Sequence, residues 1–171
     1  MFLLSIGLFK LIFTKIEGKN PADDYGRTPL HWAADEGNLE IINLIFDKTG
    51  VKNPATKDGI TPLLVAAEKG HLEVFKFIFD RVNDKNPTTD DLFTPLHGAA
   101  QYGHLDICKI ILEKVDNKNP STIDGWTPLM LAEDNGHFDI EKLIISKMKE
   151  NNNTLRSKMK ENNNTLRVTY I

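Results

Sequence analysis

Two short motifs recur along this chain at one fixed interval. Thr-Pro-Leu begins at Thr28, Thr61, Thr94 and Thr127, and Lys-Asn-Pro begins at Lys19, Lys52, Lys85 and Lys118. Both motifs advance by 33 residues at every step, without any insertion. One period shared by two independent motifs indicates identical supersecondary units that stack on one another. The chain is therefore expected to form a linear array in which each unit contacts only its neighbours.

Each repeat reads as two helices followed by a loop. Thr28 is a helix N-cap, and Pro29 occupies the first helical position, where its missing N–H costs nothing. Gly37 suits the end of this short helix, and a second helix with an apolar stripe begins near Leu39. The loop contains Asp-Gly at residues 58–59, a strong signal for a tight hairpin turn. The repeat is therefore helix, turn, helix and a hairpin-tipped loop.

These residues resemble the ankyrin repeat, which has the signature Thr-Pro-Leu-His-x-Ala and a length of 33 residues. The matching segments are residues 26–34, 61–67 with 70–71, 94–100 with 103–104, and 127–129 with 136–137. The resemblance covers residues 5 to about 148. It implies an all-α solenoid of stacked helix-turn-helix units with hairpin loops.

The sequence departs from the signature at three positions. Leu64 and Met130 replace the signature histidine, and Leu92 replaces the glycine of the other hairpins. If Leu92 adopts a positive φ, the left-handed conformation strains its backbone by ~1 kcal/mol. Otherwise, this hairpin has a different shape from the others.

The period divides the chain into segments. Residues 1–18 read as a truncated repeat that keeps only its second helix, because residues 8–13 fall on 41–46 when they are moved by one period. Four repeats follow, at 19–51, 52–84, 85–117 and 118–147. The N-terminus does not read as a signal peptide, since Lys10 interrupts its apolar run and no small-x-small cleavage site follows.

Residues 148–171 form a polar, duplicated tail. The sequence of residues 146–156 is repeated without change at 157–167. The apolar residues of the duplication are Met148, Leu155, Met159 and Leu166. Their spacing of 7, 4 and 7 indicates an 11-residue helical repeat. With so few apolar residues and two triple-asparagine runs, however, we expect this tail to be disordered.

The charge is unevenly distributed between the array and the tail. The chain has a net charge of −3, but residues 146–171 hold six basic and two acidic residues, a net of +4. The other 145 residues therefore carry −7. An acidic array disfavours a nucleic-acid partner, because nucleic-acid binding depends on basic patches.

The five histidines all occupy repeat positions. They are His31 and His97 after Thr-Pro-Leu, and His71, His104 and His137 after glycine. Equivalent residues of adjacent repeats lie roughly 8–10 Å apart, which is too far for two rings to share a zinc ion at about 2 Å each. We expect structural rings, bonded to the threonine hydroxyl and nearby backbone, and no metal site.

The sequence contains no motif for catalysis or cofactor binding. Cys-x-x-Cys, His-Glu-x-x-His, phosphate-loop and Gly-x-Ser-x-Gly patterns are all absent. Cys108 is the single cysteine, which excludes an internal disulfide. Its column holds Ile42 and Phe75 in other repeats, so a buried, inert thiol is expected. The chain is therefore not expected to be an enzyme or to bind a cofactor.

An asparagine follows each second helix. These residues are Asn20, Asn53, Asn86 and Asn119. The resemblance implies two roles for them: hydroxylation by an asparaginyl hydroxylase, or a structural role in a local turn. Each precedes a proline that alters the local backbone, and this favours the structural role.

The resemblance places partner binding on the hairpin tips and on the exposed face of the first helices. Transferred residue by residue, it selects Asp24, Tyr25, Arg27, Asp35, Glu36; Lys57, Asp58, Ile60, Glu68, Lys69; Asp90, Asp91, Phe93, Gln101, Tyr102; and Ile123, Asp124, Trp126, Asp134, Asn135. Nine of these are acidic and three are basic. The expected partner segment therefore carries basic residues together with an apolar anchor.

One column of these candidates stands just before each signature threonine. It reads Arg27, Ile60, Phe93 and Trp126. Stacked at the repeat spacing, these side chains form either an exposed ridge, rich in interface hot-spot types, or rings that pack on their own or the next hairpin. Trp32 is left open between core and surface, because its column holds Val65, Gly98 and Leu131.

The expected function is a non-catalytic protein–protein interaction module, a scaffold or adaptor located in the cytoplasm or nucleus. The alternative is the recognition arm of a larger protein, such as a ubiquitin-ligase adaptor, a kinase or a channel. The expected partner is a protein, with no nucleic acid and no membrane insertion. The chain is expected to be monomeric or to self-associate weakly through its N-terminal helix.

Overall fold

The computed structural model describes the backbone of residues 21–168 and the side chains of residues 21–154. This part contains eight helices and no strand. The truncated repeat expected in residues 1–18, and self-association through it, lie outside the described residues. The first helices of the repeats are α2 (Pro29–Asp35), α4 (Pro62–Lys69), α6 (Pro95–Gln101) and α8 (Pro128–Asp134). The second helices are α3 (Leu39–Thr49), α5 (Leu72–Arg81), α7 (Leu105–Lys114) and α9 (Phe138–Val168).

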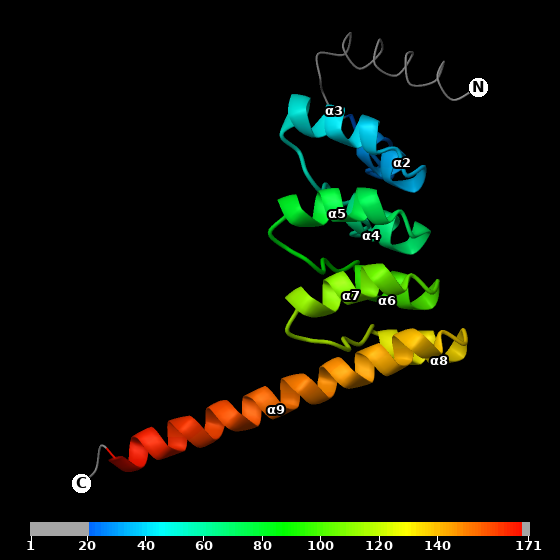
Figure 1. Cartoon of the computed structure of the whole chain (residues 1–171). Coiled ribbons are helices and arrows are strands. Elements are labelled where there is room, and N and C mark those ends of the chain that lie inside the picture. The colour runs from blue at the N-terminus through cyan, green and yellow to red at the C-terminus, as the bar shows by residue number, and fades with distance from the viewer. Residues whose placement is uncertain (1–20, 169–171) are drawn as a thin grey trace.

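The four helix pairs stack in one column, with a hairpin loop leading from each pair to the next (Figure 1). This arrangement confirms the expected all-α solenoid of helix-turn-helix units. First helices contact one another more extensively than second helices do, because small buried residues such as Ala66, Ala67, Ala99 and Ala100 line their interfaces. Larger side chains, including Phe75 and Ile111, fill the space between first and second helices.

The helix starts follow the expected design. Thr61, Thr94 and Thr127 have extended backbones, and each hydroxyl accepts a hydrogen bond from the backbone N–H three residues later. Proline fills the next position in every case. This pairing satisfies one of the otherwise unpartnered N–H groups at the start of a helix.

The Lys-Asn-Pro motif joins one repeat to the next. The Oδ1 atom of Asn53 accepts a hydrogen bond from the backbone N–H of Leu63, ten residues later, at 3.0 Å. Asn86 and Asn119 accept in the same way from the backbone N–H groups of Leu96 and Leu129. The ammonium of Lys118 donates to the carbonyl of Leu112 at the end of α7, at 2.6 Å. Lysine thus caps one helix while asparagine caps the next. The asparagine role is structural, as expected, but its partner is ten residues away rather than in a local turn.

The histidines join neighbouring repeats as well. His31 Nδ1 lies 3.0 Å from the hydroxyl of Thr28 and accepts from the Thr28 backbone N–H, so its Nε2–H donates to the carbonyl of Ile60 at 3.0 Å. His97 repeats this arrangement with Thr94 and the Trp126 carbonyl. The predicted structural rings are confirmed at these two positions.

The histidines after glycine reach backward along the stack. The Nε2 atoms of His71, His104 and His137 bond to backbone carbonyls of the preceding repeat, at Asp35, Glu68 and Gln101. Gly37, Gly70 and Gly103 of the preceding repeats lie against these rings: a Cβ added at Gly70 would lie 2.3 Å from the ring of His104. Each histidine is therefore part of a repeat interface.

The third hairpin has the same shape as its neighbours despite its different residue. Leu92 has a φ of 63°, in the left-handed region otherwise occupied by glycine in the described residues. The strained alternative is thus the correct one. The side chain of Leu92 is 45% exposed, and the left-handed conformation strains its backbone by ~1 kcal/mol.

The expectation of a disordered tail is wrong up to Val168, because α9 continues to that residue. Ile140 and Ile144 are buried against the last repeats, so the first turns of α9 are fixed by packing. Each further residue then adds one backbone hydrogen bond without a new nucleation step. The lysine, methionine, glutamate and arginine residues of the duplication are good helix formers and offset the asparagines.

Candidate binding groove

A groove of about 790 Å3 runs along one side of the stack, between the hairpins and the first helices. Its lining residues come from three successive hairpins and from α4, α6 and α8. They are Asp58, Ile60, Leu64, Glu68, Thr89, Asp91, Phe93, Gln101, Thr122, Asp124, Trp126, Leu131, Asp134 and Asn135. The groove is thus a continuous surface that spans repeats instead of a pocket inside one of them.

Ten of the candidates selected from the sequence meet in this groove. These are Asp58, Ile60, Glu68, Asp91, Phe93, Gln101, Asp124, Trp126, Asp134 and Asn135. The five candidates of the first repeat lie outside it: Asp24, Tyr25, Arg27, Asp35 and Glu36. The remaining five, Lys57, Lys69, Asp90, Tyr102 and Ile123, are also not lining residues. Tyr25 and Ile123 are 72% and 66% exposed.

The column before the signature threonines, here called the ridge column, consists of Arg27, Ile60, Phe93 and Trp126. Its side chains are neither fully exposed nor fully packed. Trp126 is 44% exposed, whereas Ile60 and Phe93 are half-buried. The Phe93 ring stacks on His97, with centroids 5.1 Å apart and an interplanar angle of 28°. Its ring therefore packs on its own repeat while its free face lines the groove. Both interpretations of the column hold in part.

Arg27 and Trp32 form a separate pair at the first repeat. The guanidinium of Arg27 lies 5.5 Å from the centroid of the Trp32 ring. Trp32 is 53% exposed, so it is a surface residue rather than a core one. Arg27 thus ends the ridge column with a cation–π contact of about 0.5–1 kcal/mol at an exposed site.

Sequence reasoning missed four lining residues: Leu64, Leu131, Thr89 and Thr122. The column of Leu64 holds histidine or methionine in the other repeats, and that of Leu131 holds tryptophan, valine or glycine. Variation within a repeat column is the signal that could have found them. The hydroxyls of Thr89 and Thr122 accept from the backbone N–H groups of Phe93 and Trp126, each at 3.0 Å. These threonines therefore position the two aromatic residues.

Gly98 in α6 leaves room for the side chain of Glu68, which lines the groove. A Cβ placed there would lie 2.5 Å from Cγ of Glu68. The Glu68 side chain therefore occupies the space that a larger residue would take. Burial raises the pKa of Glu68, while the neighbouring Lys69 acts in the opposite direction. This carboxylate is only partly solvated, and a cation placed beside it would offset the free-energy cost of burying its negative charge.

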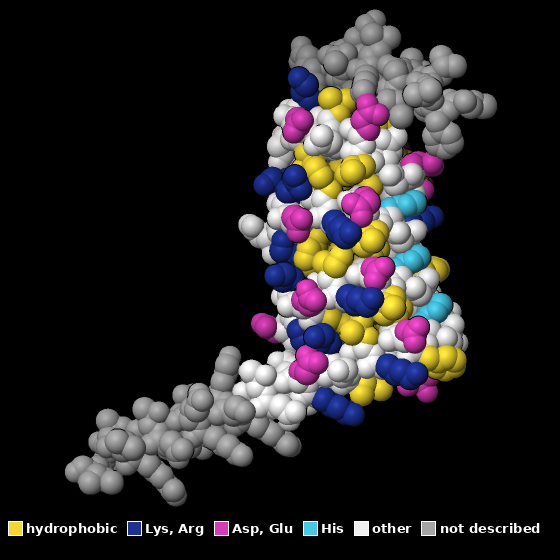
Figure 2. Space-filling view, viewed as in Figure 1, with side chains coloured by type: hydrophobic (Ala, Val, Ile, Leu, Met, Phe, Trp, Pro, Cys, Tyr) yellow, Lys and Arg dark blue, Asp and Glu magenta, His cyan; other side chains and the backbone are white. Residues whose placement is uncertain are grey.

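The groove has one sign of charge. Asp58, Glu68, Asp91, Asp124 and Asp134 line it, and no lysine, arginine or histidine is among its described lining residues. The opposite face, made by α3, α5 and α7, carries acidic and basic side chains interspersed (Figure 2). There Lys76 pairs with Glu73 at 3.0 Å and Lys109 with Asp106 at 2.9 Å. Surplus negative charge is therefore concentrated on the groove side.

The described residues hold no cluster of metal ligands, and the single cysteine is buried. No group of three or more His, Cys, Asp or Glu in that part of the chain could hold a metal ion. Cys108 is buried, as predicted, and burial raises the pKa of its thiol to about 12. Over residues 21–168, no helix combines the length and apolarity that crossing a bilayer requires.

The stacked helix pairs, the hairpins and the groove define a repeat protein with an extended binding surface. A family model described as ankyrin repeats (3 copies) matches residues 3–91 and 82–156, so the chain belongs to the ankyrin-repeat family. Ankyrin repeats are generally protein–protein interaction modules and typically non-catalytic. A search of curated proteins finds no match to the sequence.

Proposed function

We propose that this protein is a non-catalytic scaffold or adaptor whose groove binds a protein segment with basic residues and an apolar anchor. The observation that carries the proposal is the pairing of aromatic side chains with five unneutralised carboxylates in one groove. Neither feature alone specifies a partner, but together they select a segment that is both apolar and cationic.

The apolar half of the site is centred on Phe93 and Trp126. These two residues belong to adjacent repeats and line the same groove, with Ile60 on the next hairpin. Tryptophan is among the residue types most enriched at interface hot spots. An aliphatic or aromatic side chain laid across this row would be removed from water on several sides.

The electrostatic half is formed by the carboxylates that flank this row. Asp58, Asp91 and Asp124 stand on successive hairpins, and Glu68 and Asp134 stand on first helices. None of the five has an ion-pair partner within 4 Å among the described residues. Lysine or arginine in a partner would therefore find carboxylates on both walls, which favours fast and salt-sensitive association.

No histidine, cysteine, serine or lysine is among the described lining residues of the groove. His97, the histidine nearest to its aromatic row, is bonded at both ring nitrogens, and Cys108 is fully buried. We therefore infer a binding role without catalysis. The intracellular setting, cytoplasmic or nuclear, is inferred from the family alone.

The test is a selection from a random peptide display library on the immobilised protein. We expect enriched peptides to combine lysine or arginine with a large apolar residue, and to bind more weakly as salt is raised. Replacing Phe93→Ala and Trp126→Ala together should weaken the selected peptides at least 30-fold, or about 2 kcal/mol. Equal affinity in a well-folded double variant would contradict the proposal.

A matched control is available on the same molecule. Tyr25→Ala combined with Ile123→Ala also removes two large exposed side chains near the hairpins, but neither residue lines the groove. This variant should keep wild-type affinity. A comparable loss in both variants would show that the effect is one of general surface apolarity and not of the groove.

A further inference from the structure

The second half of α9 projects beyond the stack. Met148 still packs against the core cluster, and the Asn151 side chain donates to the carbonyl of Asp116 at 3.0 Å. After this point the helix continues alone to Val168, away from the repeats (Figure 1). At 1.5 Å per residue, residues 152–168 form a rod of about 25 Å.

The sequence of this projecting half is opposite in charge to the groove. Residues 152–168 contain Arg156, Lys158, Lys160 and Arg167 against one acidic residue, Glu161, for a net charge of +3. The apolar residues are Leu155, Met159 and Leu166. This composition, basic with spaced aliphatic anchors, is the one that the groove selects under the proposed function.

We propose that the projecting half of α9 in one copy of this chain docks in the groove of a second copy. The inference rests on the proposed function, because it names the occupant of the same groove. Five groove carboxylates face a segment of net charge +3, and aliphatic anchors face the row of Ile60, Phe93 and Trp126.

The spacing of the anchors fits the spacing of the repeats. Met159 and Leu166 are seven residues apart, so they share one face of a helix and are separated by about 10.5 Å along its axis. Phe93 and Trp126 are equivalent residues of adjacent repeats, roughly 8–10 Å apart. A helix lying along the groove therefore presents one anchor to each aromatic residue.

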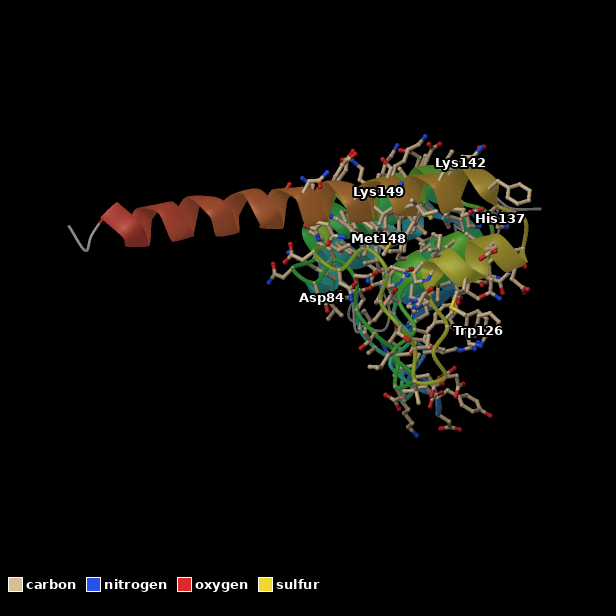
Figure 3. All side chains as sticks on the ribbon, turned by 90° about the horizontal axis from the view of Figure 1, so that it is seen from below. Asp84, Trp126, His137, Lys142, Met148 and Lys149 are labelled. Atoms are coloured by element: carbon tan, nitrogen blue, oxygen red, sulfur yellow. The ribbon has the colours of Figure 1, made fainter. Side chains whose placement is uncertain are left out.

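The geometry of α9 requires the docking to occur between copies. Seen along the stack, α9 and the hairpin that carries Trp126 lie on opposite sides of α8, and the helix points away from the repeats (Figure 3). The projecting half therefore cannot enter its own groove without unwinding. Contact between a tail and another copy's groove joins two different surfaces, so it gives either a reciprocal pair or an open chain.

Pairing of two projecting helices with each other is disfavoured by charge. Each carries +3, so side-by-side association would bring like charges together along its length. The groove of a second copy provides five carboxylates instead. The charge distribution of the molecule, acidic in the array and basic in the tail, therefore favours tail-to-groove contact.

Two variants of the chain test the groove and the projecting half of α9 separately. The groove variant carries Phe93→Ala and Trp126→Ala, and the tail variant carries Met159→Gln and Leu166→Gln. The tail control carries Ser157→Gln and Asn164→Gln, which introduce the same residues, with the same spacing and no charge change, on the opposite face of the helix. Their masses are measured over a range of concentrations by analytical ultracentrifugation at low salt.

We expect the wild-type protein and the tail control to associate, and each variant alone to show at least tenfold weaker association. An equimolar mixture of the two variants should form a 1:1 heterodimer, because the tail variant supplies a groove and the groove variant supplies a tail. A mixture that stays monomeric, or a groove variant that associates like the wild type, would overturn the inference.

Failure of this inference is distinguishable from failure of the proposed function. A wild-type chain that is monomeric at all concentrations but still binds library-selected peptides in its groove would remove the tail as occupant and leave the function intact. A wild-type chain that binds no basic, apolar peptide would contradict both.

Discussion

The groove side and the opposite side of the stack are stabilised by different forces. Single polar contacts hold the hairpins and the starts of first helices, such as His31 to Ile60 and Asn86 to Leu96. The second helices are held by fully buried apolar side chains, among them Phe75 and Ile111. The comparison teaches that the hairpins of the recognition surface depend on specific hydrogen bonds, whereas the helices depend on burial.

The largest stability effect is expected on the side held by burial. Ile111→Ala removes a side chain with no exposed area and should lower the free energy of unfolding by about 2–5 kcal/mol, through lost burial and the cavity left behind. Ile110→Ala, one position away and half-buried, is the matched control and should cost much less. Chemical denaturation measures both, and equal losses would break the comparison.

A smaller loss of stability is expected where one hydrogen bond is removed. Asn86→Ala leaves the backbone N–H of Leu96 without its partner and should cost about 1–3 kcal/mol, the usual penalty for an unsatisfied buried donor. Asn83→Ala changes an exposed residue of the same loop and should stay within about 0.5 kcal/mol. If thermal melts of the two variants coincide, the asparagine bond does not stabilise the junction.

The polar contacts should also make the groove side sensitive to pH. Burial is the main cause that lowers the pKa of His31 and His97 in the folded state. As pH falls below the ordinary value of 6.5, the unfolded chain therefore binds protons first, and stability declines towards the lower, folded pKa. Above 6.5 the contribution is constant.

The test compares melting temperatures between pH 7.5 and 5 in the wild type and in a variant with His31→Leu and His97→Leu. Leucine is a natural choice because Leu64 stands at the equivalent position of the second repeat. The variant should be less stable at neutral pH but should lose less stability on acidification. Parallel pH profiles would show that these two rings are not responsible.

The smallest effect is expected at the strained hairpin. Leu92→Gly removes the cost of a left-handed leucine, of about 1 kcal/mol, but gives the unfolded chain more freedom. The net result should be a gain below about 1 kcal/mol, measured by denaturation. Affinity for groove-selected peptides should not change, since Leu92 is not a lining residue.

The parts of the fold that are local in sequence could be predicted from it. Thr61 and Pro62 start a helix because cap and first turn are decided within a few residues, and the 33-residue period extends that result along the chain. The groove was predictable only in part. Leu64 and Leu131 line it because of the repeats packed around them, and a single repeat does not contain that information.

Composition was a poor guide to α9. The duplicated segment is polar and rich in asparagine, which argues for disorder when it is read alone. Buried Ile140 and Ile144 anchor the helix upstream, however, and propagation from an existing helix is much easier than nucleation. Sequence windows that stop at a repeat boundary cannot take this neighbour into account.

The bonds between hairpins have a consequence for how the groove responds to load. Neighbouring hairpins are joined by one backbone hydrogen bond, from Asp90 to Asp58 and from Ile123 to Asp91, whereas the helices share buried apolar surface. An elastic body that is stiff along one edge and compliant along the other flexes about its stiff edge. Bending of this array therefore changes the separation of the hairpins, so that one sequence can accept ligands of different thickness without repacking its core.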